Sequence, residues 1–217
     1  MSDCNHIGLT RMVTNGTNEN DWKTLSTLAK VYSQIIPSFG LHPWFINDRS
    51  SNWFKLLEQK IDNHNGAVGE IGLDLFRKKL QYNEQKEVFL SQLQLSADRN
   101  IPVSIHCIKA WNQIYNLLSD NQLPKRGFLL HGFSGPAEMI NPLTNLGAYF
   151  SFSGSFAHAN KSRQRNNFCK IPINRILIES DAPFQLMPDN FITHPLEQKT
   201  YHPANIKIIY KFAAECI

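Results

Sequence analysis

The feature that most constrains the fold is a regular alternation of short β-prone runs with helical segments along the chain. The sequence predicts strands over residues 11–15, 34–39, 66–70, 102–106, 127–131, 148–152 and 175–179. Between them it predicts helices beginning near residue 20, over 51–63, 84–100, 111–118, 137–146 and 158–168, and after residue 203. Strands that alternate with helices across short loops indicate parallel strands with helical crossovers, which is an α/β fold.

The ends of the predicted strands favour a barrel over an open sheet. Each strand has a polar or reactive residue at its C-terminal end or just past it. Residues from many strands that meet at one rim are typical of a TIM (β/α)8-type barrel, whereas an open sheet gathers its site at one switch point. A closed barrel has eight strands and typically ~250 residues, but this chain has seven predicted strands in 217 residues. We therefore expect one incomplete barrel domain over residues 1–217.

Four strand ends carry side chains that can bind a metal ion: Glu70, His106, His131 and Asp181. A buried carboxylate such as Glu70 is costly unless it is paired or bound to a cation. Imidazole and carboxylate groups are the usual ligands of hydrolytic metals. A single histidine that ends a strand is more often structural, but four aligned strand ends favour a metal site. Asp181 is also a candidate to orient or deprotonate an attacking water.

Other residues near these strand ends are candidates for substrate contact. His42 follows the strand over 34–39, although a structural role in the turn is about as plausible. Lys109 follows the strand that ends at residue 106 and could meet an anion; the alternative is an ordinary solvated lysine. Trp44 and Phe45 could line a pocket for a base or ring, with loop packing as the default interpretation.

Composition bounds the setting in which the protein works. The net charge of +4 suits a phosphate-rich substrate without indicating a dedicated nucleic-acid coat. The four cysteines form no CxxC pair, which is typical of reduced thiols. The chain contains no run of ~18 apolar residues, so no membrane span is expected. The N-terminus has no signal-peptide pattern. We expect a cytoplasmic protein with no membrane partner.

The chain resembles the TatD family of metal-dependent deoxyribonucleases and hydrolases, which are amidohydrolase-like TIM barrels. The resemblance extends from about Arg11 to the C-terminal helix. The matching motifs, in order, are Gly-Leu-His-Pro at 40–43, Gly-Glu-Ile-Gly-Leu-Asp at 69–74, Pro-Val-Ser-Ile-His-Cys at 102–107, His-Gly-Phe-Ser-Gly at 131–135 and Glu-Ser-Asp-Ala-Pro at 179–183.

The resemblance implies a role for each strand-end residue. Glu70 resembles the carboxylate that bridges two divalent metal ions, which could be zinc, magnesium or manganese. His106 and His131 resemble the pair that binds the second metal, and Asp181 resembles the aspartate at the first metal that helps to activate water. The implied activity is hydrolysis of phosphodiester bonds in DNA. Small phosphoesters, esters or amides are alternative substrates, because a fold does not fix its substrate.

One departure from the family pattern concerns the first metal. The family opens with a strand that carries a His-x-His motif, whereas residues 5–8, Asn-His-Ile-Gly, lack the second histidine. We expect that the first strand is missing from this sequence and that the last helix is shortened. A degenerate, non-catalytic barrel that binds a metal, a nucleic acid or a partner is the alternative from another class. The oligomeric state is not predicted.

Overall fold

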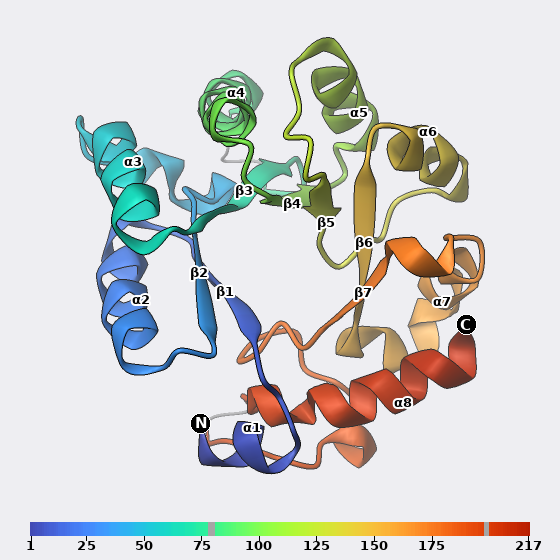
Figure 1. The fold of residues 1–217 in the computed structure, drawn as a ribbon. Helices are drawn as coiled ribbons and strands as arrows, with labels where there is room; N and C mark the ends of the chain where they lie inside the picture. The colour runs from blue at the N-terminus through green and yellow to red at the C-terminus, as the bar shows by residue number, and fades with distance from the viewer. Residues whose placement is uncertain (78–80, 198–199) are drawn as a thin grey trace. The chain divides into compact units, whose positions relative to one another are not determined.

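The computed structural model describes residues 1–77, 81–197 and 200–217. These residues fall into two compact units, which we name after their strands (Figure 1). The β1–β5 unit consists of residues 11–130 and 145–148, and the β6–β7 unit consists of residues 1–10, 131–144 and 149–217. A single domain over residues 1–217 stays a prediction.

The β1–β5 unit is a parallel sheet in which each strand pairs with the next one along the chain. Its strands are β1 (Met12–Gly16), β2 (Ile35–Phe39), β3 (Ala67–Asp74), β4 (Val103–Ile108) and β5 (Phe128–Leu130). Its helices are α2 (Glu19–Val31), α3 (Trp53–His64), α4 (Tyr82–Arg99) and α5 (Trp111–Asp120), and the 3-10 helix η1 (Pro43–Asp48) follows β2. Helix α2 packs on β1 and β2, α3 on β2, α4 on β3 and α5 on β4. This is the βαβ arrangement that the alternating pattern predicts.

Local sequence signals set the ends of these helices. The side chain of Asn18 accepts hydrogen bonds from the backbone amides of Asn20 and Asp21, which caps the start of α2. Helix α4 ends at Arg99 and is followed by Asn100, whose φ of 49° is left-handed. Along α4, Phe89 and Leu93 lie one turn apart and are fully buried, so this face of the helix meets the sheet.

The β6–β7 unit has a parallel pair of strands, β6 (Ala148–Ser153) and β7 (Ile176–Glu179). Its helices are α1 (Ser2–His6), α6 (Ile140–Asn145), α7 (Ser162–Phe168) and α8 (Ile206–Cys216), with α8 packed on β7. Its 3-10 turns are η2 (Ala137–Met139), η3 (Gly154–Ala157), η4 (Ala159–Lys161), η5 (Ile173–Arg175), η6 (Asp189–Phe191) and η7 (Pro203–Asn205).

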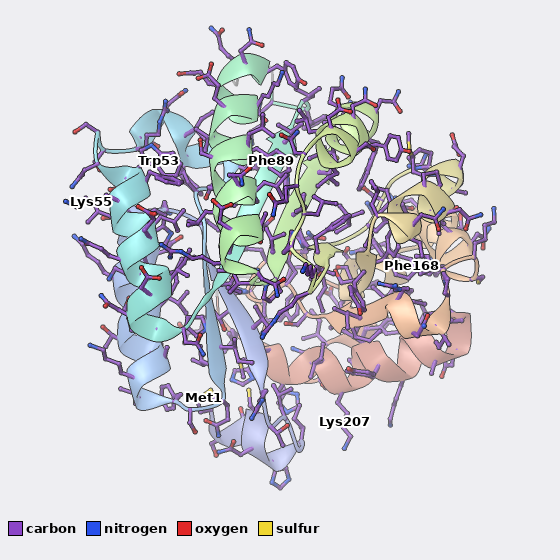
Figure 2. The ribbon with its side chains drawn as sticks, turned by 45° about the horizontal axis from the view of Figure 1, so that its top comes forward. Met1, Trp53, Lys55, Phe89, Phe168 and Lys207 are labelled. Atoms are coloured by element: carbon purple, nitrogen blue, oxygen red, sulfur yellow. The ribbon has the colours of Figure 1, made fainter. Side chains whose placement is uncertain are left out.

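An aromatic cluster forms the core of the β6–β7 unit. The ring of Phe152 lies 5.1 Å from that of Phe168 and 5.3 Å from that of Phe156, both in edge-to-face geometry, and Phe133 packs on Phe150 in the same manner at 4.9 Å. Edge-to-face pairs add to the stabilisation that burial of the rings provides. Figure 2 labels Phe168 in this unit and, by contrast, Lys207, which points away from α8.

The described residues contain the seven strands that the sequence predicts, with two differences in detail. Strand β3 continues four residues past Glu70, the expected end, to Asp74. The short helix α1 is not predicted from the sequence, because its five residues lack an apolar periodicity. Among the described residues, no helix combines the length and the apolar character needed to cross a bilayer.

Candidate metal centre

Three buried side chains of the β1–β5 unit form a group that could hold a metal ion. His42, Glu70 and His106 each offer one ligand atom, and these atoms lie within 4.8 Å of one another. Glu70 Oε1 is 3.4 Å from His42 Nε2 and 3.0 Å from His106 Nδ1. Ligands of a tetrahedral zinc ion with bonds of ~2.1 Å lie about 3.4 Å apart. Both the donor types and their spacing therefore fit a divalent cation.

Glu70 lies in a β-bulge. The register of β3 against β4 shifts between Val68 and Ile71. Two β3 residues, Gly69 and Glu70, therefore lie opposite the single β4 residue Ser104, and such a bulge re-aims a side chain next to a functional site. A Cβ atom on Gly69 would lie 2.8 Å from the Cβ of Ser104, so the close strand contact at the bulge requires glycine.

A second glycine brings the His42 segment against Glu70. A Cβ atom on Gly40 would lie 2.7 Å from the carbonyl carbon of Gly69 and 2.9 Å from the amide nitrogen of Glu70. The absence of this atom lets the chain after β2 pass close to the bulge. The Nδ1 atom of His42 accepts a hydrogen bond from the backbone amide of Trp44 at 3.2 Å, and the opposite ring nitrogen, Nε2, faces Glu70.

The imidazole of His106 lies between two carboxylates. Its Nδ1 is 3.0 Å from Glu70 Oε1, and its Nε2 is 3.3 Å from Asp74 Oδ2. Asp74 also accepts hydrogen bonds from the Trp44 indole at 2.6 Å and from the Phe76 amide at 2.9 Å. Burial alone would raise the pKa of Asp74, but the bonds from His106, Trp44 and Phe76 outweigh it and hold that pKa well below its ordinary value. Asp74 is therefore ionised and orients the His106 ring.

Asp74 has no role in the sequence-based interpretation, although a signal for it exists. In a strand, residues separated by an even number point to the same face, and the sequence places Asp74 four residues after Glu70. A strand that ends at Glu70, as the sequence predicts, does not include Asp74.

Two glutamines of α4 fix the backbone on both sides of the centre. The buried side chain of Gln92 accepts a hydrogen bond from the Leu41 amide at 2.7 Å and donates one to the Leu41 carbonyl at 3.2 Å. Gln85 does the same for Asp74, at 2.7 and 3.1 Å. The two glutamines are two helical turns apart and lie on one face of α4. Helix α4 thereby anchors the residue before His42 and the end of β3.

Replacing Gln92 with leucine is expected to destabilise the protein by on the order of 3 kcal/mol. The change keeps the side chain's approximate size but leaves the buried amide and carbonyl of Leu41 without these partners, each at about 1–3 kcal/mol. Gln94→Leu is the matched control, because Gln94 is exposed on the same helix and its side chain donates a hydrogen bond to Asp98, which is also exposed. Urea denaturation measures both, and equal midpoints for Gln92→Leu and Gln94→Leu would contradict the anchoring role.

In the β6–β7 unit, His131 and Glu179, the first residues of the motifs at 131–135 and 179–183, lie close together. His131 Nδ1 lies 3.4 Å from Glu179 Oε1. The other oxygen of Glu179, Oε2, accepts a hydrogen bond from the Ser151 hydroxyl, which in turn accepts one from the Gly132 amide at 3.0 Å. Glu179 Oε1 is buried and has no hydrogen-bond donor among the described residues. A cation or a proton on His131 would compensate this oxygen.

Asp181 follows β7 by two residues and has a left-handed φ of 52°. The single hydroxyl hydrogen of the buried Tyr201 is shared between the carbonyls of Ser180 and Gln185, which stabilises this turn. Burial, with the negative charges of Asp181 and Glu179, raises the pKa of Tyr201 above its ordinary value. The phenol therefore stays protonated and remains a donor.

The structure thus groups some of the sequence-predicted residues. Glu70 and His106 lie together, and they are joined by His42, which the sequence predicts as a substrate contact. His131 and Asp181 belong to the other unit. Lys109 directly follows β4 with a left-handed φ of 54° and is exposed. The roles of these six residues in metal or substrate binding stay predictions.

Comparisons with known proteins place the chain among hydrolases. A family model described as "TatD related DNase" matches residues 1–217. The "uncharacterized metal-dependent hydrolase YjjV" of Escherichia coli (strain K12) is 28% identical over 179 residues, which are 81% of this chain and 69% of the relative. The "3'-5' ssDNA/RNA exonuclease TatD" of the same strain is 30% identical over 207 residues, which are 92% of this chain and 76% of the relative.

A third relative, an "uncharacterized metal-dependent hydrolase" of Haemophilus influenzae, is 32% identical over 76% of this chain and 66% of its own length. The chain therefore spans about two thirds to three quarters of these relatives.

Solved structures agree on the fold. The crystal structure of YjjV, a TatD homologue from Escherichia coli K12, matches with a TM-score of 0.88 at 24% identity, over 99% of this chain and 82% of that chain. A TatD family hydrolase from Entamoeba histolytica matches with a TM-score of 0.83 at 21% identity, over 99% of this chain and 80% of that chain. The predicted α/β fold of the TIM-barrel type is confirmed.

Proposed function

The chain belongs to the TatD related DNase family, and we propose that it is a metal-dependent hydrolase that cleaves phosphodiester bonds of DNA. The observation that carries the proposal is the buried group of His42, Glu70 and His106, whose donor atoms lie within 4.8 Å of one another. Relatives named as metal-dependent hydrolases and as a single-stranded DNA/RNA exonuclease support it.

Glu70 and His106 are the residues of this group that we propose as metal ligands, with Asp74 holding the imidazole of His106 in place. A carboxylate or backbone partner on the outer nitrogen of a ligating histidine fixes its tautomer and orientation. Asp74 is suited to this role because it is buried, ionised and held by Trp44 and Phe76. When bound, a divalent cation there lowers the pKa of water and stabilises negative charge on phosphoryl oxygens.

From the sequence motifs, we propose His131 and Asp181 as further ligands, so that up to two cations are held in all. In hydrolysis, the water oxygen forms a bond to phosphorus, and the bond from phosphorus to the leaving ester oxygen breaks. The proposed role of the Asp181 carboxylate is to accept the proton that the attacking water loses. His42 and Lys109 are the proposed substrate contacts, since both can meet a phosphate oxygen.

The cytoplasmic location stays a prediction from the sequence. The four cysteines are free thiols in the structure.

The proposal is tested by metal depletion and reconstitution. The protein is dialysed against a chelator and then assayed with a 5′-labelled single-stranded DNA and with a panel of small phosphoesters and carboxylic esters, with zinc, manganese or magnesium added. We expect cleavage of DNA only with a divalent cation, because neutral water is a poor nucleophile without one. Bound metal is counted by elemental analysis.

The matched variants separate the metal centre from incidental binding. His106→Ala is expected to lower both the bound metal and the hydrolysis, whereas His6→Ala, at an exposed histidine of α1, leaves both unchanged. Hydrolysis of small esters without cleavage of DNA would show that the substrate is a small ester and not DNA. Metal binding by a folded protein with no hydrolysis of any substrate would indicate a non-catalytic binding barrel.

A further inference from the structure

Two exposed aromatic rings of the β1–β5 unit each have a cationic side chain over them, and one of the rings, Trp44, lies next to the metal-binding group. Trp44 is 38% exposed and Phe76 is 64% exposed. Arg77 and Lys109, both exposed, come from the segments that follow β3 and β4. We name these four residues the stacking patch.

The cations of the stacking patch lie over its rings. The guanidinium carbon of Arg77 is 3.6 Å from the centroid of the Trp44 ring. The ammonium of Lys109 is 4.6 Å from the centroid of the Phe76 ring. Both distances are within the range of cation–π attraction. Each ring therefore carries a positive charge over one face, so a base would stack on the opposite face or in place of the cation.

Trp44 connects the stacking patch to the metal-binding group. Its indole nitrogen donates to Asp74 Oδ2 at 2.6 Å, and the same oxygen lies 3.3 Å from His106 Nε2. The Trp44 ring lies 4.9 Å from the His42 ring and 6.0 Å from the His106 ring. A group stacked on the exposed part of Trp44 thus lies close to the residues proposed to hold the metal.

The chemistry of the patch selects an unpaired nucleotide. Aromatic rings stack on nucleobases of any sequence, and nearby cations neutralise the phosphates between them. In a duplex, the base faces are covered by their neighbours, so a ring gains access only to a strand whose bases can unstack. The rings alone would suit any apolar ligand; the paired cations and the neighbouring phosphodiester chemistry favour nucleic acid.

We infer that Trp44, Phe76, Arg77 and Lys109 form a subsite that binds a nucleotide of single-stranded DNA, with a base on the rings and a phosphate at the cations. This inference rests on the proposed function and deepens it. The subsite would place the adjacent phosphodiester at the group of His42, Glu70 and His106, and it makes the enzyme select strands with unpaired bases.

The test measures binding without turnover. Fluorescence anisotropy compares a labelled ten-nucleotide oligothymidylate with the same strand built from abasic residues, both in EDTA. We expect the wild-type protein to bind the base-bearing strand about tenfold more tightly, which is a typical effect of base–aromatic stacking. Phe76→Ala is expected to remove most of this preference, and Phe76→Trp to retain it. Phe76 is exposed, so neither change disturbs the core.

Charge variants and a control distinguish base stacking from electrostatic attraction to the phosphates. Arg77→Gln and Lys109→Gln are expected to weaken binding of both strands alike and to reduce its salt dependence. Tyr210→Ala, at a 58% exposed aromatic residue of α8, leaves the preference unchanged. Equal binding of the two strands by the wild type, no binding of either strand, or an unchanged preference in Phe76→Ala overturns the inference.

The outcomes for the subsite and for the proposed function are distinguishable. If the protein cleaves DNA with metal but binds both strands equally, the proposed function is supported and the subsite is contradicted. A tenfold preference in EDTA, lost in Phe76→Ala, supports the subsite even when no hydrolysis follows the addition of metal.

Discussion

Replacing Glu70 with glutamine is expected to lower metal-dependent hydrolysis of DNA by at least about 100-fold. Loss of a residue that only supports a metal ligand already lowers activity by up to about 100-fold, and Glu70 is proposed as a ligand itself. Glu70 is the residue of the buried group that both histidines face, with His42 at 3.4 Å and His106 at 3.0 Å. Glutamine keeps the shape but removes the negative charge that balances a cation. The measurement is the initial rate of cleavage of a labelled single strand, together with the bound metal per chain.

Glu87→Gln is the matched control, because Glu87 lies on α4 of the same unit with an exposed side chain. It is expected to retain the wild-type rate and metal content. Thermal unfolding followed by circular dichroism checks that Glu70→Gln is folded at the assay temperature. A folded Glu70→Gln variant with wild-type rate and metal content would rule out the proposed centre.

The largest effect on stability is expected from Phe152→Ala, at about 3–5 kcal/mol. Phe152 is fully buried, and its ring packs edge to face on Phe156, Phe168 and Phe212, with centroids 5.1–5.8 Å away. Truncation removes these contacts and leaves a cavity that surrounding rings cannot fill without leaving their own partners. Urea denaturation followed by far-ultraviolet circular dichroism measures the loss as a lower midpoint.

Phe184→Ala makes the same chemical change at a residue that is 72% exposed in the same unit. Its effect is expected to stay within about 0.5 kcal/mol, as for most surface substitutions. A midpoint for Phe152→Ala as high as that for Phe184→Ala would show that the aromatic cluster is not the core of the β6–β7 unit.

The sequence predicts the order and type of the strands well, because parallel strands buried by helices have a strong apolar signal. It predicts β3 too short, since Glu70 interrupts the apolar run. The strand continues because a bulge turns Glu70 toward His42 and His106, while Ile71 and Leu73 stay fully buried. Periodicity alone does not reveal a bulge, which depends on the neighbouring strand.

The sequence predicts only part of the candidate site, because the rest depends on how neighbouring elements pack. Glu70 and His106 carry motif signals along the chain, and the structure brings them together. Their partners Gln85 and Gln92 carry no such signal, because a glutamine on a helix is usually exposed. Only the packing of α4 on β3 shows that these two amides are buried and bonded to backbone.

The paired glutamines of α4 also bear on how the candidate site is lost when the protein partly unfolds. Local unfolding proceeds in cooperative segments. If α4 detaches from the sheet, the hydrogen bonds to Leu41 and Asp74 break in the same event. The loop of His42 and the residue that orients His106 are then released together. We therefore expect the site to form and unfold as one cooperative segment together with α4.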